Sequence, residues 1–166
     1  MRLKKVVSGG QTGADRAALD VAIEQGLLVG GWVPKGRLAE DGPIPAQYPG
    51  LVETESSDLA LRTVQNVRDS DATLIVSHGP PSGGSLFTLE EARRSRKPVL
   101  HLDLLRLAPA SAAAQLLEWL ADVDPAVLNV AGPRASEDVT IFAAVAALLR
   151  AVLPLVEARA RPPGEC

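Results

Sequence analysis

The sequence predicts an α/β protein in which a mostly parallel sheet carries helices on both faces. Short segments rich in Val, Ile and Leu alternate with helix-forming segments, the pattern of right-handed β-α-β crossovers. Hydrophobic residues make up 46% of the 166 residues and aromatic residues only 3%, so the core must be built from Ala, Val, Leu and Ile. Such a composition favours helices packed on a buried aliphatic sheet.

The expected elements follow from hydrophobic periodicity and from capping and turn residues. Strands are expected at residues 4–8, 27–33, 51–54, 72–77, 99–102 and 127–130. Thr12 is predicted to cap the first helix, with Asp15 reaching back toward it, and Gly26 to end that helix. Ser57 or Asp58 is expected to cap a second helix that runs through Arg68. Further helices are expected at residues 86–96, 110–121 and 137 to about 153.

The chain length suits one domain, which we place at residues 1–158, with a flexible C-terminal tail at 159–166. Between the second and third strands, the segment PKGRLAEDGPIPAQYPG at residues 34–50 has no periodicity. A loop of this length inside a compact domain is usually functional or disordered.

Charge and composition exclude several classes of function. The net charge of −3 argues against a broad nucleic-acid-binding face. The single cysteine, Cys166, and two histidines are too few for a thiolate or His-rich metal site, so no protein-ligated metal is predicted. The longest apolar run, residues 139–149, is too short to span a bilayer, and no signal peptide is expected. The sequence therefore predicts a cytoplasmic protein without membrane contact.

Three expected strands end in loops of small residues that open helices. These loops begin at Ser8, Ser77 and Asn129, and all three must lie on the same edge of a parallel sheet. If the first and third strands are neighbours, their loops face each other across a crevice. Glycines allow close backbone approach, and the N–H groups at a helix start favour an anion. The loops match neither the Walker A nor the G-x-G-x-x-G pattern, so P-loop hydrolysis is not expected.

Several charged residues allow two interpretations. Asp15 is either a capping acid or a catalyst, and the capping rule favours the first. Arg16 opposes the helix dipole at the start of its helix, which indicates either an anion partner or a solvated surface position. Glu90 either forms a surface pair with Arg94 or faces a ligand from the helix behind the second loop.

Two further polar groups are also ambiguous. His78 is expected to be a structural histidine with satisfied hydrogen bonds. Lys35 and Arg37 lie in the long loop beside acidic residues, where solvated loop charge is slightly favoured over contact with a ligand.

The stretches SGGQTGADRAALD, WVPKGRLAEDGPIPAQYP and SHGPPSGGSLFTLEEA together resemble the molybdenum cofactor carrier family. That family is the YpsA-like branch of the superfamily that also contains lysine-decarboxylase-like phosphoribohydrolases. The resemblance implies a Rossmann-like three-layer sandwich, an oligomer, and a pocket for a phosphorylated ligand, which in carrier members is the pterin-based molybdenum cofactor (molybdopterin). A molybdoenzyme client is also implied.

Combined with the loops, the resemblance identifies a set of candidate ligand-binding residues. Backbone amides around the loop glycines would cradle the phosphate, Arg16 and Thr88 would contact it, and Lys35 and Arg37 would close over it. The full set is Gly9, Gly10, Gln11, Thr12, Gly13, Asp15, Arg16, Lys35, Arg37, Ser82, Gly83, Gly84, Ser85 and Thr88.

Three classes of function compete. The leading one is a carrier or sensor that binds a phosphate-bearing nucleotide-like or pterin ligand. The alternative is a nucleoside-monophosphate phosphoribohydrolase, an N-glycosidic hydrolase with Glu90 as the catalytic acid/base. The phosphoribohydrolase relatives use Pro-Gly-Gly-x-Gly-Thr-x-x-Glu, which this chain matches only in part, because Ser82 replaces the proline and the spacing to Thr88 is one residue longer. A purely structural module leaves the facing loops unexplained.

The sequence also favours a homo-oligomer. In the last expected helix, Ile141, Phe142, Val145, Leu148 and Leu149 alternate only with alanines. A helix that is apolar all round must be covered, by its own core or by a partner subunit.

Overall fold

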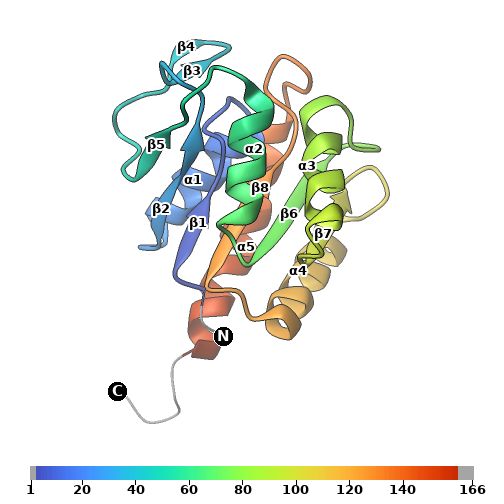
Figure 1. The fold of residues 1–166 in the computed structure, drawn as a ribbon. Coiled ribbons are helices and arrows are strands. Elements are labelled where there is room, and N and C mark those ends of the chain that lie inside the picture. Colours follow the sequence, from blue (N-terminus) through green and yellow to red (C-terminus); the bar gives the residue numbers. More distant parts are fainter. Residues whose placement is uncertain (1–2, 161–166) are drawn as a thin grey trace.

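The computed structural model describes residues 3–160, which form a six-stranded parallel sheet in the order β5-β2-β1-β8-β6-β7 (Figure 1). The sheet strands are β1 (Lys5–Val7), β2 (Leu28–Val33), β5 (Leu51–Glu53), β6 (Ala72–Ser77), β7 (Val99–Asp103) and β8 (Val127–Ala131). The helices are α1 (Ala14–Glu24), α2 (Leu59–Arg68), α3 (Gly83–Arg94), α4 (Pro109–Val123) and α5 (Ile141–Ala160). The predicted α/β, Rossmann-like sandwich is confirmed.

Helices cover both faces of the sheet. Helices α1 and α4 pack against α5 on one face, while α2 packs against α3 on the other (Figure 1). The core is aliphatic, as the composition requires, with Leu19, Leu74, Ile75 and Leu128 among its largest fully buried side chains.

The strand order places a crevice above β8. From β1 the chain proceeds to β2 and β5 on one side, and from β6 it proceeds to β7 on the other, while β8 lies between β1 and β6. The loops after β1 and β6 therefore lead to helices on opposite faces of the sheet (Figure 1). This reversal is the position at which parallel α/β sheets bind ligands, beyond the carboxyl ends of the strands.

The start of α1 differs from the expected capping box. The N-cap residue is Gly13, with φ 77°, and no side chain caps the helix. The Thr12 hydroxyl instead donates to Glu40 and accepts a hydrogen bond from the Ala135 amide at 3.1 Å. The capping role predicted for Thr12 was wrong, because its hydroxyl is hydrogen-bonded to these two distant segments and not to an amide of α1.

Residues 34–50 form an ordered segment around a small hairpin of β3 (Leu38–Ala39) and β4 (Gly42–Pro43). Ile44 and Tyr48 are buried, and the Tyr48 hydroxyl donates to Asp20 at 2.7 Å. The buried side chains of Ile44 and Tyr48 thus hold this segment against the rest of the domain, although its sequence shows no periodicity.

Helices α3 and α5 also begin and end away from their expected bounds. Helix α3 starts at Gly83 instead of Leu86, so the glycines form its first turn. Helix α5 starts at Ile141 instead of Glu137 and extends to Ala160, two residues into the expected tail. The rest of that tail, including Cys166, lies outside the described residues.

Most of the apolar surface of α5 is covered within the chain. Ile141, Val145, Leu149 and Val152 are buried against the core, because α5 packs against both α1 and α4. The apolar character of this helix therefore requires no partner subunit. No helix in the described part of the chain is long and apolar enough to cross a membrane.

Candidate functional site

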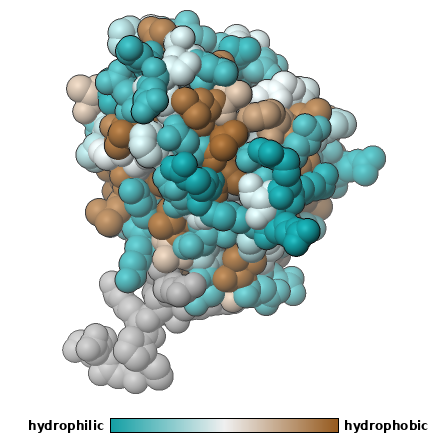
Figure 2. Space-filling view, in the orientation of Figure 1, coloured by the Kyte–Doolittle hydropathy of each residue, from teal (hydrophilic) through white to brown (hydrophobic). Residues whose placement is uncertain are grey.

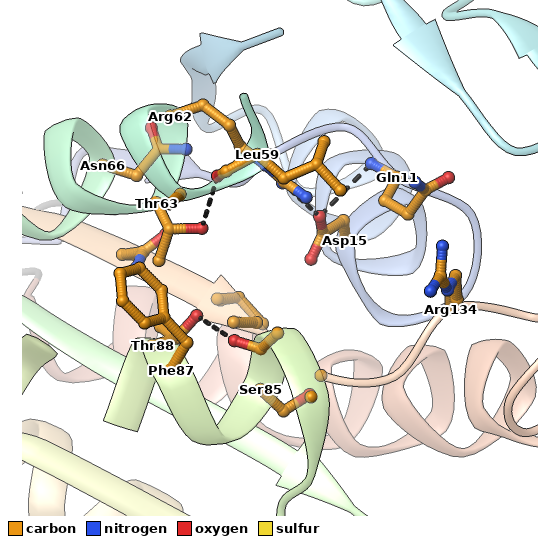
Figure 3. A pocket seen from close by; sticks show the side chains of 18 of the residues that line it. Gln11, Asp15, Leu59, Arg62, Thr63, Asn66, Ser85, Phe87, Thr88 and Arg134 are labelled. Carbon is orange, nitrogen blue, oxygen red and sulfur yellow. Dashed lines mark hydrogen bonds and ion pairs between the residues drawn. The ribbon is translucent and has the colours of Figure 1, made fainter. Parts of the chain in front are cut away.

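A cavity of about 300 Å³ lies above the carboxyl end of β8, between α1, α2 and α3 (Figure 3). Its volume is at the lower end of the range for small-molecule sites. Its lining comes from the β1–α1 loop with the first turn of α1, from α2, from the first turns of α3, and from the end of β8 with the β8–α5 loop. The lining residues are Gly9, Gln11, Asp15, Leu59, Ala60, Arg62, Thr63, Asn66, Gly83, Gly84, Ser85, Phe87, Thr88, Asn129, Val130, Ala131, Gly132, Arg134 and Glu137.

The start of α3 forms one wall of the cavity. The amides of Ser85 and Leu86 donate to the Ser82 carbonyl at 3.1 and 3.3 Å, so the amides of Gly83 and Gly84 precede the first helical hydrogen bonds. A Cβ added at Gly84 would meet nothing within 4 Å. This helix start therefore offers backbone donors and the positive end of the helix dipole to an anion beside it.

The opposite wall contains a buried ion pair. Asp15 accepts a hydrogen bond from the Gln11 amide at 3.2 Å and contacts Nη1 of Arg62 at 3.3 Å. Burial raises the pKa of Asp15, and the nearby Arg62 charge opposes part of that rise. A Cβ at Gly9 would lie 1.3 Å from Arg62 Nη1, so only glycine leaves room for the guanidinium in this position.

Arg62 is held by few contacts for a residue of its charge. Its Nε atom is buried and has no hydrogen-bond partner among the described residues. Its only ion pair among the described residues is the single 3.3 Å contact with Asp15. An arginine can donate five N–H bonds, so Arg62 keeps donors for a ligand in the cavity.

The β8–α5 loop adds Arg134 and Glu137, which pair with each other at 2.8 Å. Of the described residues that line the cavity, Arg62 and Arg134 are cationic, and Asp15 and Glu137 are anionic. Because these four charges balance, the side chains alone give the cavity no net charge, and the groups that could attract an anion are the backbone donors of α3 and the N–H groups of the two arginines.

The structure brings together half of the predicted ligand-binding set. The predicted residues that line the cavity are Gly9, Gln11, Asp15, Gly83, Gly84, Ser85 and Thr88. Those that do not line it are Gly10, Thr12, Gly13, Arg16, Lys35, Arg37 and Ser82. Sequence reasoning missed the contribution of α2, from Leu59 to Asn66, because this helix carries no motif.

Arg16 binds an anion within the protein instead of one in the cavity. Its guanidinium forms a bidentate ion pair with the Asp41 carboxylate, in which Nη2 donates to Oδ1 at 2.7 Å. The Nε of Arg16 donates to the Gly10 carbonyl at 3.2 Å. The unfavourable position of Arg16 at the start of α1 is thus offset by a carboxylate from the hairpin.

Arg37 and Lys35 do not reach the cavity either. The Arg37 guanidinium donates to the carbonyls of Ile44 and Pro45, within its own segment. Lys35 is exposed, and its amide donates to Ser56 at 3.0 Å. The closure of these two cations over a ligand stays a prediction.

Glu90 is exposed and lies outside the cavity. The surface pair with Arg94, one of the two alternatives for Glu90, was wrong, because Arg94 bonds the buried Glu91 at 2.5 Å. The buried side of α3 carries Thr88 and Leu89, which turns Glu90 outward. The acid that the hydrolase alternative requires is therefore not at the candidate site.

The hairpin is fastened to the start of α1 and to the β8–α5 loop through two acids. Glu40 accepts hydrogen bonds from the Thr12 hydroxyl and from the Ser136 amide and hydroxyl, the amide at 3.0 Å. Asp41 pairs with Arg16. These contacts hold the pKa of both acids below their ordinary values, through the hydroxyls for Glu40 and through the guanidinium for Asp41.

We expect acid to loosen this hairpin. An acid whose pKa is lowered by folding stabilises the folded protein at pH values above its ordinary pKa, which is 4.5 for Glu40 and 3.8 for Asp41. This stabilisation is lost as the pH falls through the lower pKa that the acid has in the folded protein. The melting temperature should therefore fall as the pH drops below 4.5, and the fall should be smaller in a Glu40→Gln, Asp41→Asn double variant. Glu118→Gln, at an exposed site on α4, is the control and should keep the wild-type acid profile.

A second, open cavity adjoins the first and shares Ser85 and Glu137 with it. It contains His78, whose Nδ1 lies 2.6 Å from Asp138. The expectation of a structural histidine agrees with this contact. Ser82, predicted to bind the ligand, lines this second cavity.

The fold and site define a class of protein: a Rossmann-like domain with a cavity at the point where its strand order reverses. The chain belongs to the circularly permutated YpsA SLOG family, whose model matches residues 6–153. This confirms the family expected from the three sequence stretches.

A solved structure supports the same relationship. The chain is 50% identical to a protein from Syntrophus aciditrophicus described as a "putative molybdenum carrier protein", with a TM-score of 0.89. The match covers 91% of this chain and 95% of that one. No curated protein with significant similarity was found.

Proposed function

We propose that the protein binds a phosphate-bearing ligand with a pterin or nucleotide-like ring and acts as a carrier of the molybdenum cofactor. The observation that carries this proposal is the cavity itself, which lies where the strand order reverses and is open to the first turn of α3. The name of the Syntrophus aciditrophicus protein supports the choice of cargo.

The phosphate of the ligand would lie at the start of α3. The amides of Gly83 and Gly84 would donate to it, with the Ser85 hydroxyl beside them. Arg62 and Arg134 would approach from α2 and from the β8–α5 loop. Charge-assisted hydrogen bonds from a guanidinium are stronger than neutral ones, so these two arginines should contribute more per contact than the hydroxyls.

The metal would be carried by the cargo. Among the described residues, no group of three or more His, Cys, Asp or Glu side chains is placed to hold a metal ion. A pterin dithiolene brings its own molybdenum, so the chain needs to recognise only the organic part and its phosphate.

Carriage is favoured over hydrolysis with Glu90 as the acid, because Glu90 is exposed and lies outside the cavity. An N-glycosidic hydrolase needs an acid to protonate the leaving base, which typically contributes about 10²- to 10⁴-fold to the rate. We expect no base release when the protein is incubated with a panel of nucleoside monophosphates. Base release that is lost in Glu90→Gln and retained in Glu91→Gln would establish the hydrolase instead.

The test of the proposal is native mass spectrometry of the protein purified from its own cells. We expect a bound species with the mass of the pterin cofactor, stoichiometric rebinding of that cofactor, and slower oxidation of the bound form. A chain that carries no ligand and does not bind the pterin would contradict the proposal. A cytoplasmic location, a molybdoenzyme client and a homo-oligomer remain parts of the proposal, and light scattering tests the last.

Replacement of Arg62 should weaken phosphate binding. Hydrogen bonds to charged groups contribute about 1.5–3 kcal/mol each, so Arg62→Met should raise the Kd of inorganic phosphate by about tenfold or more. Arg68→Met removes an exposed arginine of the same helix that pairs with Asp69, and it should leave the Kd unchanged. Titration calorimetry measures both, and equal effects would show that Arg62 acts only through the overall charge.

A further inference from the structure

The cavity has two chemically different ends. Figure 3 shows Gln11, Asp15 and Arg134 at one end, and Phe87 and Thr88 of α3 beneath Thr63 and Asn66 of α2 at the other. The first end carries charges and lies near the β1–α1 and β8–α5 loops. The second end lies between α2 and α3 and is formed by apolar, hydroxyl and amide groups without charge.

Phe87 lies at the uncharged end of the cavity and does not belong to the hydrophobic core. It is one of two phenylalanines in the chain, 36% exposed, and it lies outside the hydrophobic core. Leu59, on the α2 side of the cavity, is 44% exposed and also outside the core. Figure 2 shows apolar side chains at the surface over α2, on the face that α2 and α3 share.

The spacing along α3 relates Phe87 to the proposed phosphate position. Phe87 follows Gly84 by three residues, which is slightly less than one helical turn, or roughly 4.5 Å along the axis. Both residues line the same cavity, so the rest of a ligand whose phosphate lies at the helix start can reach Phe87. Aromatic rings prefer to pack against other rings, by offset stacking or edge to face.

The hydroxyls at this end restrict which ring edge fits. The Thr63 hydroxyl donates to the Leu59 carbonyl at 3.2 Å, and the Thr88 hydroxyl donates to the Gly84 carbonyl at 2.8 Å. With their protons used in this way, both oxygens can only accept hydrogen bonds from a ligand. They therefore suit a ring edge that carries N–H donors.

We propose that the α2–α3 end of the cavity, with Phe87 as its stacking residue, is a subsite for a planar heteroaromatic ring that carries an amino group. This proposal rests on the proposed phosphate site at the start of α3. It predicts that the protein prefers phosphate esters of such rings to inorganic oxyanions and to phosphates without a ring.

The experiment compares two phosphates that differ in the ring. GMP carries a 2-amino-4-oxopyrimidine edge of the kind found in pterins, whereas ribose 5-phosphate has the same sugar phosphate and no base. We expect wild type to bind GMP about 5- to 160-fold more tightly than ribose 5-phosphate, the range that corresponds to the roughly 1–3 kcal/mol of stacking one base on an aromatic side chain. Phe87→Ala should remove this preference without changing the Kd of ribose 5-phosphate, and Phe87→Trp should keep it.

Phe142→Ala is the matched control, because Phe142 is the other phenylalanine, is 39% exposed, and lines neither cavity. It should bind both phosphates as wild type does. Equal Kd values for GMP and ribose 5-phosphate in wild type, or unchanged GMP binding in Phe87→Ala, would overturn the ring subsite.

The outcomes also separate the two proposals. If ribose 5-phosphate and inorganic phosphate bind but GMP binds no more tightly than ribose 5-phosphate, the ring subsite fails and the phosphate site stands. If none of the three binds, both proposals are overturned.

Discussion

Replacement of Gly84 with valine is expected to abolish the stabilisation of the protein by phosphate while leaving the fold intact. A side chain at Gly84 meets nothing within 4 Å, so the valine enters the free space of the cavity without striking the protein. There it blocks the approach of an anion to the amides of the first turn. A ligand at a hundred times its Kd stabilises a protein by about 2.7 kcal/mol, and the variant should lose that gain.

The measurement is the melting temperature at increasing phosphate concentration. Glu90→Val provides the control, because it places the same β-branched residue on the same helix at an exposed position outside the cavity. It should lower the melting temperature slightly and keep the full phosphate-dependent shift. A shift of wild-type size in Gly84→Val would refute the assignment of the anion site to the start of α3.

Gly13→Ala is expected to cause a large loss of stability. Gly13 has φ +77°, which strains any other residue, and a Cβ there would lie 2.5 Å from the Pro133 carbonyl oxygen and 3.0 Å from the Ala135 amide nitrogen. Both neighbours are backbone atoms, so the β8–α5 loop must move away from α1. We expect a loss of about 2–5 kcal/mol. The melting temperature should fall by roughly 5–20 °C for a chain of this size.

Gly26→Ala separates the two causes of this loss. Gly26 has a similar φ of +73° but nothing within 4 Å of an added Cβ, so its substitution adds only the backbone strain of about 1–2 kcal/mol. Thermal unfolding followed by circular dichroism compares the two variants. If both lose the same stability, the close approach of the two loops contributes nothing.

The sequence by itself determined that helices cover both faces of a parallel sheet, and that glycine-rich loops form part of the candidate site. Strand and helix patterns depend on the spacing of apolar side chains along the chain, which can be read without knowing any partner. Glycines after a strand mark a turn into a helix, so Gly9, Gly83 and Gly84 could be assigned to the carboxyl edge of the sheet, where they line the cavity, before the fold was known. The resemblance to the YpsA-like family also depended on local sequence, including the glycine-rich stretches after these strands, and the family match over residues 6–153 confirmed it.

Only the tertiary structure decided which charged side chains face the cavity. Arg62 comes from a helix without a motif, and its contact with Asp15 joins residues 47 positions apart. Arg16, predicted to bind the ligand, is paired with Asp41 instead. Glu90, the catalytic acid of the hydrolase alternative, is turned outward by the buried side of α3. A long charged side chain can reach several possible partners, and which one it binds depends on burial and on the distance between segments that are far apart in sequence. Local patterns of residues do not contain this information, so the backbone of the site was predictable and its ionic contacts were not.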